Sequence, residues 1–223
     1  MRYSIILPIL NEENNLTQNK SFLNKLKNTL NAELIFVDGM SQDKSLMVSH
    51  TLSKKVYIET ASRSKQLNRG VRHATGEYLI FLHADTKLDD IAINNILKIS
   101  KNYKWGFFNI YLDDNSWKYK ILSYCINLRS RLFKYGTGDQ VLIIKKDIFD
   151  KIKGYKDIPL MEDIEICNRL KNLYMPEIHH GKSITSTRRW KAHGFFKTIL
   201  LMRILRLLYY LGVDPKKLEL IYK

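Results

Sequence analysis

The 223-residue chain is poor in cysteine and proline, with two cysteines and four prolines, and it has no repeat, low-complexity run or proline-rich linker. Cys125 and Cys167 lie among apolar residues, without CxxC spacing or a histidine close by. Isolated cysteines of this kind argue against a disulfide or a zinc site and are typical of reduced thiols in the cytoplasm. We therefore expect two buried thiols in a single domain, because a chain of this length fits one core.

Long hydrophobic runs are also missing. The first apolar run, residues 4–10, is short and is followed by Asn11, so a secretory signal is not expected and the mature chain is expected to begin at Met1. A second apolar stretch, residues 195–211, carries three basic residues and is shorter than the roughly 20 residues that span a bilayer. It predicts an amphipathic helix that either packs on the core or lies on an anionic membrane surface.

Acidic residues are outnumbered, with 22 Asp and Glu against 37 Lys and Arg, which gives a formal net charge of +15. A positive charge of this size favours anionic partners, which include nucleic acid, anionic lipid and phosphorylated small molecules. The basic residues are spread along the whole chain, so charge alone does not choose among these partners. We expect no nucleic-acid partner, and peripheral contact with the inner face of a membrane stays open.

The first half of the chain alternates short apolar runs with amphipathic stretches, which predicts an α/β fold: a mostly parallel sheet flanked by helices. The predicted strands are residues 3–9, 33–37, 56–59, 77–82, 106–112 and 140–145. The predicted helices are residues 13–30, 43–52, 65–74, 89–100, 117–133 and 162–173, followed by a helical, basic C-terminal segment. Asn11 and either Ser41 or Asp43 are the expected caps of the first two helices.

Polar residues directly follow three of the predicted strands. Because ligands bind at the carboxyl ends of parallel strands, Glu12, Asp38 and Asp85 are expected to converge on one rim. Converging carboxylates repel one another unless a cation or a donor such as a ribose hydroxyl compensates them, although each alone could cap a helix. Asp85 is the natural ligand for Mg²⁺ or Mn²⁺. His83 points to the same side of an extended chain, and it either orients a metal or phosphate or is structural.

Several stretches together resemble family 2 glycosyltransferases. They are SIILPILNEENNL from residue 4, IFVDGMSQDKS around Asp38, SRSKQLNRGVRHATGEYLIFLHADT at residues 62–86, PLMEDIEICNRL at residues 159–170, and Arg189-Trp190. They occur in the family's order and cover nearly the whole chain. Within the family the chain is most similar to short, compact, soluble bacterial members that read HADT where others have Asp-x-Asp.

The resemblance implies a GT-A fold, one Mg²⁺ or Mn²⁺ ion, and transfer from a nucleoside diphosphate sugar with inversion at the sugar. Carried over residue by residue, it assigns the nucleobase and ribose to Pro8, Asn11, Glu12 and Asp38, the nucleotide also to Arg63, and the metal to Asp85. It also divides the single domain into a nucleotide-binding half (1–88), an acceptor half (89–190) and C-terminal helices (191–223).

The resemblance makes Asp163 the general base, with Glu162 shaping the acceptor site beside it. A carboxylate within hydrogen-bond reach can take the proton of the attacking hydroxyl, and a helix N-terminus keeps that carboxylate ionised. The two acidic residues could equally serve only to stabilise the first helical turn. Arg189 and the metal would stabilise the leaving diphosphate, with a solvated basic edge as the alternative for this arginine.

Gly138 and Asp139 belong to the loop 135–140, which the resemblance places on the acceptor side together with Trp190. A tight turn that needs glycine explains this loop equally well. The family's fuller motif has a glutamine three residues before the Arg-Trp pair, where this chain has Ser186. We therefore do not expect processive polymer synthesis.

The expected function is an inverting transfer from a nucleotide sugar, with UDP as the expected nucleotide, to a hydroxyl of a lipid, glycan or small molecule. The alternative is a non-catalytic basic protein that binds nucleotide or a membrane surface on a degenerate transferase fold. The joint presence of Asp38, Asp85 and Asp163 argues against it. A nucleotidyltransferase normally has a glycine-rich phosphate loop near the first strand, and residues 8–11 provide none.

Overall fold

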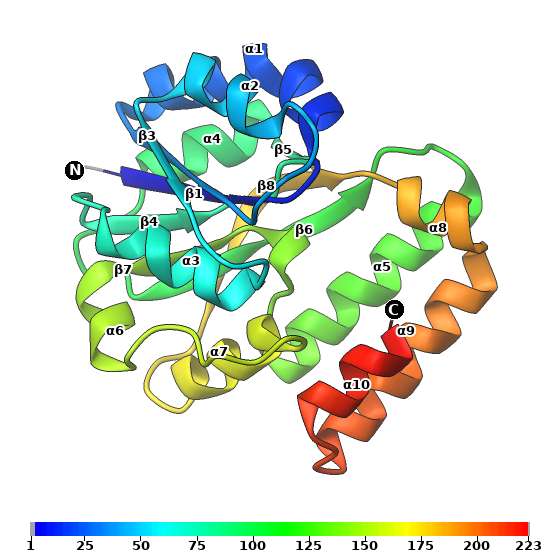
Figure 1. Cartoon of the computed structure of the whole chain (residues 1–223). Coiled ribbons are helices and arrows are strands. Elements are labelled where there is room, and N and C mark those ends of the chain that lie inside the picture. Colours follow the sequence, from blue (N-terminus) through cyan, green and yellow to red (C-terminus); the bar gives the residue numbers. More distant parts are fainter. Residues whose placement is uncertain (1–2, 223) are drawn as a thin grey trace.

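A computed structural model describes residues 3–222, and its centre is an eight-stranded sheet in the order β3-β2-β1-β4-β7-β6-β8-β5 (Figure 1). The strands are β1 (Tyr3–Ile9), β2 (Glu33–Asp38), β3 (Lys55–Ile58), β4 (Tyr78–Phe81), β5 (Thr86–Leu88), β6 (Trp105–Leu112), β7 (Leu142–Lys145) and β8 (Glu177–Thr185). The pairs β1–β2, β1–β4 and β2–β3 are parallel. The predicted α/β fold with a mostly parallel sheet flanked by helices is therefore confirmed.

Helices cover both faces of the sheet. They are α1 (Glu13–Leu30), α2 (Ser45–Leu52), α3 (Arg63–Arg72), α4 (Asp90–Leu97), α5 (Trp117–Phe133), α6 (Lys146–Lys151), α7 (Glu162–Lys171), α8 (Arg188–His193), α9 (Phe195–Tyr210) and α10 (Pro215–Tyr222), with a 3₁₀ turn η1 (Gly138–Gln140). In β1, Ile5 and Leu7 belong to the buried cluster that includes residues of α1, α2 and α4, whereas Ile6 belongs to the cluster that includes residues of α3, α6 and α7. Figure 1 shows these two sets of helices on opposite faces of the sheet. This alternation follows from the two-residue period of a strand, and it gives each face of the sheet its own core.

The second half of the sheet is mixed. Strand β7 runs antiparallel to β4 and β6, and β5 runs antiparallel to β8, which lies parallel to β6. The sequence did not predict β5 or β8. Strand β5 has only three residues, and β8 contains His179, His180 and Gly181 in its middle instead of an apolar alternation. Gly181 has φ 103°, and a Cβ there would collide with Ala92 of α4, so the glycine permits a bulge under that helix.

The predicted caps of the first two helices are wrong. Neither α1 nor α2 has a side-chain hydrogen bond at its N-cap, and α2 begins two residues later than expected. The polar side chains instead join the loops that follow β1 and β2. Asn11 N donates to Ser41 Oγ (3.0 Å), Gln42 N donates to Asn11 Oδ1 (2.8 Å), and Glu13 N donates to Asp43 Oδ2 (3.1 Å). The two loops therefore satisfy each other's backbone groups and form one rigid edge.

The two cysteines differ in their surroundings. Cys167 of α7 is buried, as expected, but Cys125 of α5 is exposed, so the prediction of two buried thiols is wrong for Cys125. The apolar neighbours that suggested its burial, including Tyr124 and Leu128, are themselves exposed. An apolar sequence context was therefore not evidence of burial here.

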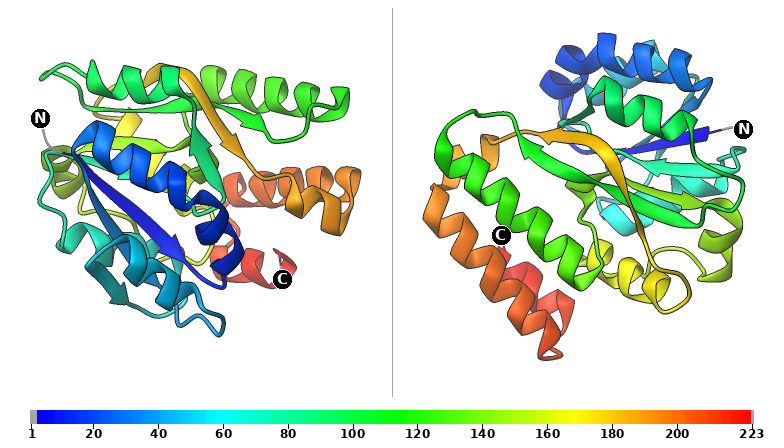
Figure 2. Two further views of the ribbon diagram at one scale, coloured as in Figure 1. Left: turned by 90° about the horizontal axis from the view of Figure 1, so that it is seen from above. Right: turned by 180° about the vertical axis from the view of Figure 1, so that it is seen from behind.

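The C-terminal helix α9 runs alongside α5 (Figures 1 and 2), and Phe195 of α9 contacts Tyr119 of α5 with their ring centres 5.2 Å apart. Only Thr198 and Leu205 of α9 are fully buried. The exposed apolar side chains of the segment 195–211 are Phe196, Leu200, Ile204, Leu207, Tyr210 and Leu211. The segment thus packs on the core along a narrow stripe. Among residues 3–222 no helix is both long and apolar enough to cross a membrane.

Candidate functional site

The ends of β1 and β4 open onto a cavity of about 690 Å³ whose walls come from distant parts of the chain. The predicted site residues that line it are Pro8, Glu12, Arg63, Asp85, Gly138, Asp139, Glu162, Asp163, Arg189 and Trp190. Asn11 and Asp38 are the two predicted residues that do not line it. The fold therefore collects the predicted nucleotide, metal and acceptor residues around one space.

Asp38 lies at the same edge of the sheet but within its own loop. It pairs with Ile9 in the parallel register of β1 and β2, and it is only 1% exposed. Ser41 donates to the Asp38 carboxylate from its backbone N (2.9 Å) and from its Oγ (2.5 Å). The expected convergence of three carboxylates therefore holds for Glu12 and Asp85, which line the cavity, while the Asp38 carboxylate organises the loop that follows β2.

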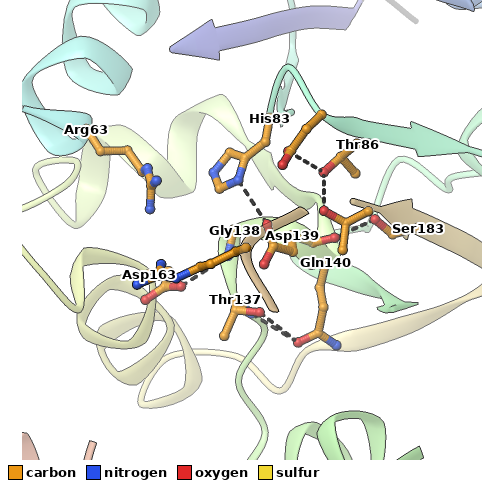
Figure 3. A network of polar contacts seen from close by, with 12 residues as sticks. Arg63, His83, Thr86, Thr137, Gly138, Asp139, Gln140, Asp163 and Ser183 are labelled. Atoms are coloured by element: carbon orange, nitrogen blue, oxygen red, sulfur yellow. Dashed lines mark hydrogen bonds and ion pairs between the residues drawn. The ribbon is translucent and has the colours of Figure 1, made fainter. Parts of the chain in front are cut away.

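A histidine and two aspartates form a cluster with the geometry of a metal site. One ligand atom from each of His83, Asp85 and Asp139 lies within 4.8 Å of the other two. His83 Nδ1 is 3.2 Å from Asp139 Oδ1 (Figure 3). His83 and Asp85 follow β4, whereas Asp139 belongs to η1, so the cluster joins the two halves of the sheet. Two carboxylates and one imidazole suit Mn²⁺ or Mg²⁺ with open positions for substrate oxygens.

The electrostatics of this cluster also fit a cation. Burial raises the pKa of Asp85 above its usual range, and the neighbouring charge of Asp139 raises it further. Burial would likewise raise the pKa of Asp139, but the hydrogen bond with His83 and the charges of Arg63 and Arg189 outweigh it and lower that pKa. The ionised form of Asp139 is thus favoured by its neighbours, whereas the negative charge of Asp85 has too little positive charge around it. A divalent cation would remove this imbalance.

Asp163 faces the same cavity from the first turn of α7. Its Oδ2 accepts a hydrogen bond from Gly138 N (3.1 Å) (Figure 3). Its Oδ1 accepts one from Ile164 N (2.7 Å). The helix begins after Met161, which adopts a left-handed conformation with φ 69°, so the chain turns sharply where it enters the site. These two backbone N–H groups fix the orientation of the Asp163 carboxylate at the start of the helix.

Glu162 is buried beside Asp163 and pairs with an arginine from the nucleotide half. Arg63 Nη1 is 3.3 Å from Glu162 Oε1, and the glutamate side chain is only 5% exposed. Burial raises the pKa of Glu162, the charge of Arg63 opposes this, and the charge of Asp163 adds to it. This ion pair connects α3 to α7 across the cavity, so Arg63 is positioned by an acceptor-side residue.

The two arginines that follow β8, Arg188 and Arg189, line the cavity. Arg188 Nη2 lies 3.7 Å from Glu12 Oε2, and burial raises the pKa of Glu12. The Arg189 guanidinium donates to the hydroxyl of Tyr222 and lies 4.1 Å from the centre of that ring. Arg188, Arg189 and Trp190 all line the cavity, so this segment is more than a solvated edge.

Sequence reasoning missed several lining residues. It left His83 undecided, assigned Asp139 to an acceptor loop instead of to a cluster with Asp85, and did not single out Arg129, Arg206 or Tyr222. The sequence signal for Asp139 was its position after two glycines and just before a buried strand, since such loops reach the rim of a sheet. No pattern in the sequence indicated that Tyr222 would meet Arg189.

Comparison with known proteins identifies the family. The sequence model described as Glycosyl transferase family 2 matches residues 4–157. The chain is 28% identical over 108 residues to the dolichol-phosphate mannosyltransferase of Pyrococcus furiosus, an alignment covering 46% of this chain and 31% of that protein. It is 30% identical over 110 residues to the minor teichoic acid biosynthesis protein GgaB of Bacillus subtilis, covering 46% of this chain and 12% of that protein. The chain thus spans a third or less of these relatives.

Solved structures share the fold at low sequence identity. The mannosyltransferase PcManGT from Pyrobaculum calidifontis, in complex with GDP-Man and Mn²⁺, superposes with a TM-score of 0.61 at 15% identity, covering 82% of this chain and 56% of that one. S. aureus TarS in complex with UDP-GlcNAc superposes with a TM-score of 0.58 at 15% identity, covering 84% of this chain and 56% of that one. These likenesses establish the fold of GT-A glycosyltransferases for this chain.

Proposed function

The chain belongs to glycosyl transferase family 2, and on that premise we propose that it transfers a sugar from a nucleoside diphosphate sugar to an acceptor hydroxyl with inversion at the anomeric carbon. The observation that carries this proposal is that the His83–Asp85–Asp139 cluster and the Asp163 carboxylate line one cavity. A transferase needs both features, a place for a charged leaving group and a base for the incoming alcohol.

The donor nucleotide binds to the half formed by residues 1–88, with UDP as the proposed nucleotide. Pro8 and Glu12, which line the cavity, contact the base and ribose, Asn11 and Asp38 shape the loop edge that receives them, and Arg63 approaches the nucleotide from α3. The joined loops after β1 and β2 support this role, because Asn11 and Asp38 fix their conformation through Ser41 and Gln42. A preorganised edge loses little conformational entropy when a ligand binds.

Asp85, His83 and Asp139 would hold Mg²⁺ or Mn²⁺, which when bound supplies positive charge for the diphosphate that leaves. Arg189 contributes further positive charge, since it lines the same cavity and its charge already acts on Asp139.

Asp163 accepts the proton of the acceptor hydroxyl as the hydroxyl oxygen forms a bond to the anomeric carbon and the bond to the diphosphate oxygen breaks. Gly138 N and Ile164 N hold the carboxylate in place at the start of α7. Glu162 fixes Arg63 and shapes the acceptor side, where residues 89–190 supply Gly138 and Trp190.

The acceptor is a lipid, a glycan or a small molecule, and the exposed apolar side chains of α9 support peripheral contact with an anionic membrane face. Phe196, Leu200 and Leu207 repeat at helical spacing, with Lys197 and Arg203 exposed beside them. A helix with apolar and basic residues arranged in this way lies in the interface plane of an anionic bilayer.

The test is a donor-hydrolysis screen of nucleotide sugars with and without Mn²⁺ or Mg²⁺. The proposal expects one UDP-sugar to be hydrolysed slowly and only with metal, and UDP with metal to raise the melting temperature by mass action. Metal-dependent UDP binding without turnover of any donor, with an acceptor extract present, would favour a non-catalytic nucleotide-binding protein. Absence of nucleotide binding would contradict the proposal outright.

A further inference from the structure

Two arginines in the cavity wall form no ion pair with a carboxylate among residues 3–222. Arg129 lies on α5, and its Nη2 donates to Ser130 Oγ (3.0 Å) and to Gln140 Oε1 (3.4 Å). Its Nε and Nη1 are buried and have no hydrogen-bond partner. Arg206 of α9 also lines the cavity, and within residues 3–222 it makes no hydrogen bond or ion pair. Both side chains line the cavity, and no described residue pairs with any donor of Arg206 there.

This arrangement is unfavourable for the protein alone. The Arg129 guanidinium lies over the Tyr135 ring, 4.8 Å from its centre, and among residues 3–222 this cation–π contact is the only direct contact that compensates its charge besides two neutral hydrogen-bond acceptors. Burial lowers the pKa of Arg129, and the charge of Arg206 lowers it further, so the two cations repel each other. A guanidinium nevertheless stays protonated in proteins. Buried donors without acceptors and adjacent like charges are both costly unless an anion binds between them.

We infer that Arg129 and Arg206 form a phosphate-binding subsite on the acceptor side of the cavity, and that the acceptor is a phosphorylated molecule whose hydroxyl reaches Asp163. The inference rests on the proposed function. A phosphate group matches the two guanidiniums because it carries up to two negative charges and three terminal oxygens, which can accept from several planar N–H donors at once. Asp163 lines the same cavity, and its charge acts on Arg129.

The subsite uses different arginines from those that act on the metal cluster. Arg63 and Arg189 act on Asp139 of the metal cluster, whereas Arg129 and Arg206 come from α5 and α9. Thr198 and Met202 of α9 also line the cavity.

The test is calorimetric titration of inorganic phosphate, glycerol 3-phosphate and geranyl phosphate into the full chain at saturating UDP and Mn²⁺, which keep the donor site filled. Arg206→Gln should weaken binding of each phosphate about tenfold or more, the loss expected for a charge-assisted hydrogen bond. Arg203→Gln is the matched control, since Arg203 lies one turn away on α9 and is exposed. It should change the affinity by less than about twofold.

Two further results complete the test. Arg206 makes no hydrogen bond or ion pair within residues 3–222 and its charge repels Arg129, so Arg206→Gln should keep or raise the melting temperature. Arg129→Gln should weaken phosphate binding similarly. If geranyl phosphate binds more tightly than glycerol 3-phosphate and both depend on Arg206, the subsite is supported and the acceptor phosphate is carried by a lipid. If the two bind equally tightly and both depend on Arg206, the subsite is supported and the acceptor is a soluble phosphorylated molecule. If the chain binds UDP but Arg206→Gln leaves the affinity for all three phosphates unchanged, the subsite is overturned while the proposed function stands. Absence of UDP binding in the unaltered chain contradicts the proposed function instead.

Discussion

His83 Nδ1 lies 3.2 Å from Asp139 Oδ1, although the two residues are 56 positions apart in the sequence. The turn η1 brings Asp139 to this place, and it is fixed from both sides: Ser183 Oγ donates to Asp139 O (2.5 Å), and Gln140 Nε2 donates to Phe108 O (3.1 Å). Gly138 precedes Asp139 in the same turn and packs directly on the His83 ring, while its backbone N donates to Asp163. A single turn therefore positions the metal cluster and the proposed base together.

Replacing Gly138 with alanine should disturb both groups. A Cβ at this position would collide with the His83 ring, and an overpacked site of this kind costs about 1–3 kcal/mol in the free energy of unfolding. In a His83→Ala background the obstacle is absent, so the same change should cost less than about 0.5 kcal/mol. Urea unfolding of the four proteins measures this coupling; equal costs in both backgrounds would show that the clash is not the cause.

Asp139→Asn should lower the affinity for Mn²⁺ by about tenfold or more, because an anionic ligand is replaced by a neutral amide in a partly buried cluster. Mn²⁺ binding is measured by electron paramagnetic resonance of the free ion. Asp150→Asn, an exposed aspartate of α6, is the matched control and should bind Mn²⁺ as the unaltered chain does. Identical affinities for all three proteins would remove Asp139 from the site.

Asp163→Asn should reduce sugar transfer by about 10²-fold or more while UDP affinity stays within about twofold, since a base acts on the acceptor proton and not on the nucleotide. Initial rates with the donor found in the screen, together with UDP titration, separate the two effects. Asp157→Asn, whose side chain is 64% exposed six residues earlier, serves as the control. Near-normal transfer by Asp163→Asn would rule out its role as the base.

Glu33 should make the fold sensitive to acid. Burial would raise its pKa, but hydrogen bonds from Lys55, Ser4 and Thr75 outweigh burial and lower the pKa to about 2. Because the pKa is lower in the folded state, this stabilisation is full above the unfolded value of 4.5 and is lost as the pH falls toward 2. It amounts to about 2 kcal/mol once solvent screening is allowed for.

Glu33→Gln should therefore destabilise the chain at pH 7 and flatten the decline of unfolding free energy between about pH 5 and pH 2. Urea unfolding at several pH values provides the measurement. Asp147→Asn, which changes an exposed carboxylate of α6, should leave that decline unchanged. A decline in Glu33→Gln as steep as in the unaltered chain would show that the network around Glu33 does not carry the effect.

The sequence predicted the first half of the fold well because its signals are local. Strands β1, β2 and β4 are continuous apolar runs, and the residues that follow them, Glu12 and Asp85, line the cavity as expected. Strand β8 could not be predicted in the same way. The residue types in β8 fit neighbours that are distant in the sequence, since Gly181 makes room for Ala92 and His179 is buried against Tyr103.

The site was predicted as separate pieces, and its assembly was not. The position of Asp163 at a helix start could be read from the sequence, but the hydrogen bond from Gly138 N depends on a contact across 25 positions. The same holds for the cluster of Asp85 with Asp139 and for the pair Arg63–Glu162, which bridges α3 and α7. Local patterns indicate which side chains are polar at a strand end, whereas only the packed fold decides which of them meet.

The central claim is that Asp85 anchors a metal ion that supports nucleotide binding in the cavity it shares with Asp163. Its most direct test is calorimetric titration of UDP with and without Mn²⁺ into the unaltered chain and into Asp85→Asn. The claim predicts that Mn²⁺ strengthens UDP binding by about tenfold or more in the unaltered chain and by less than about twofold in Asp85→Asn. Equal strengthening by Mn²⁺ in both proteins would contradict it.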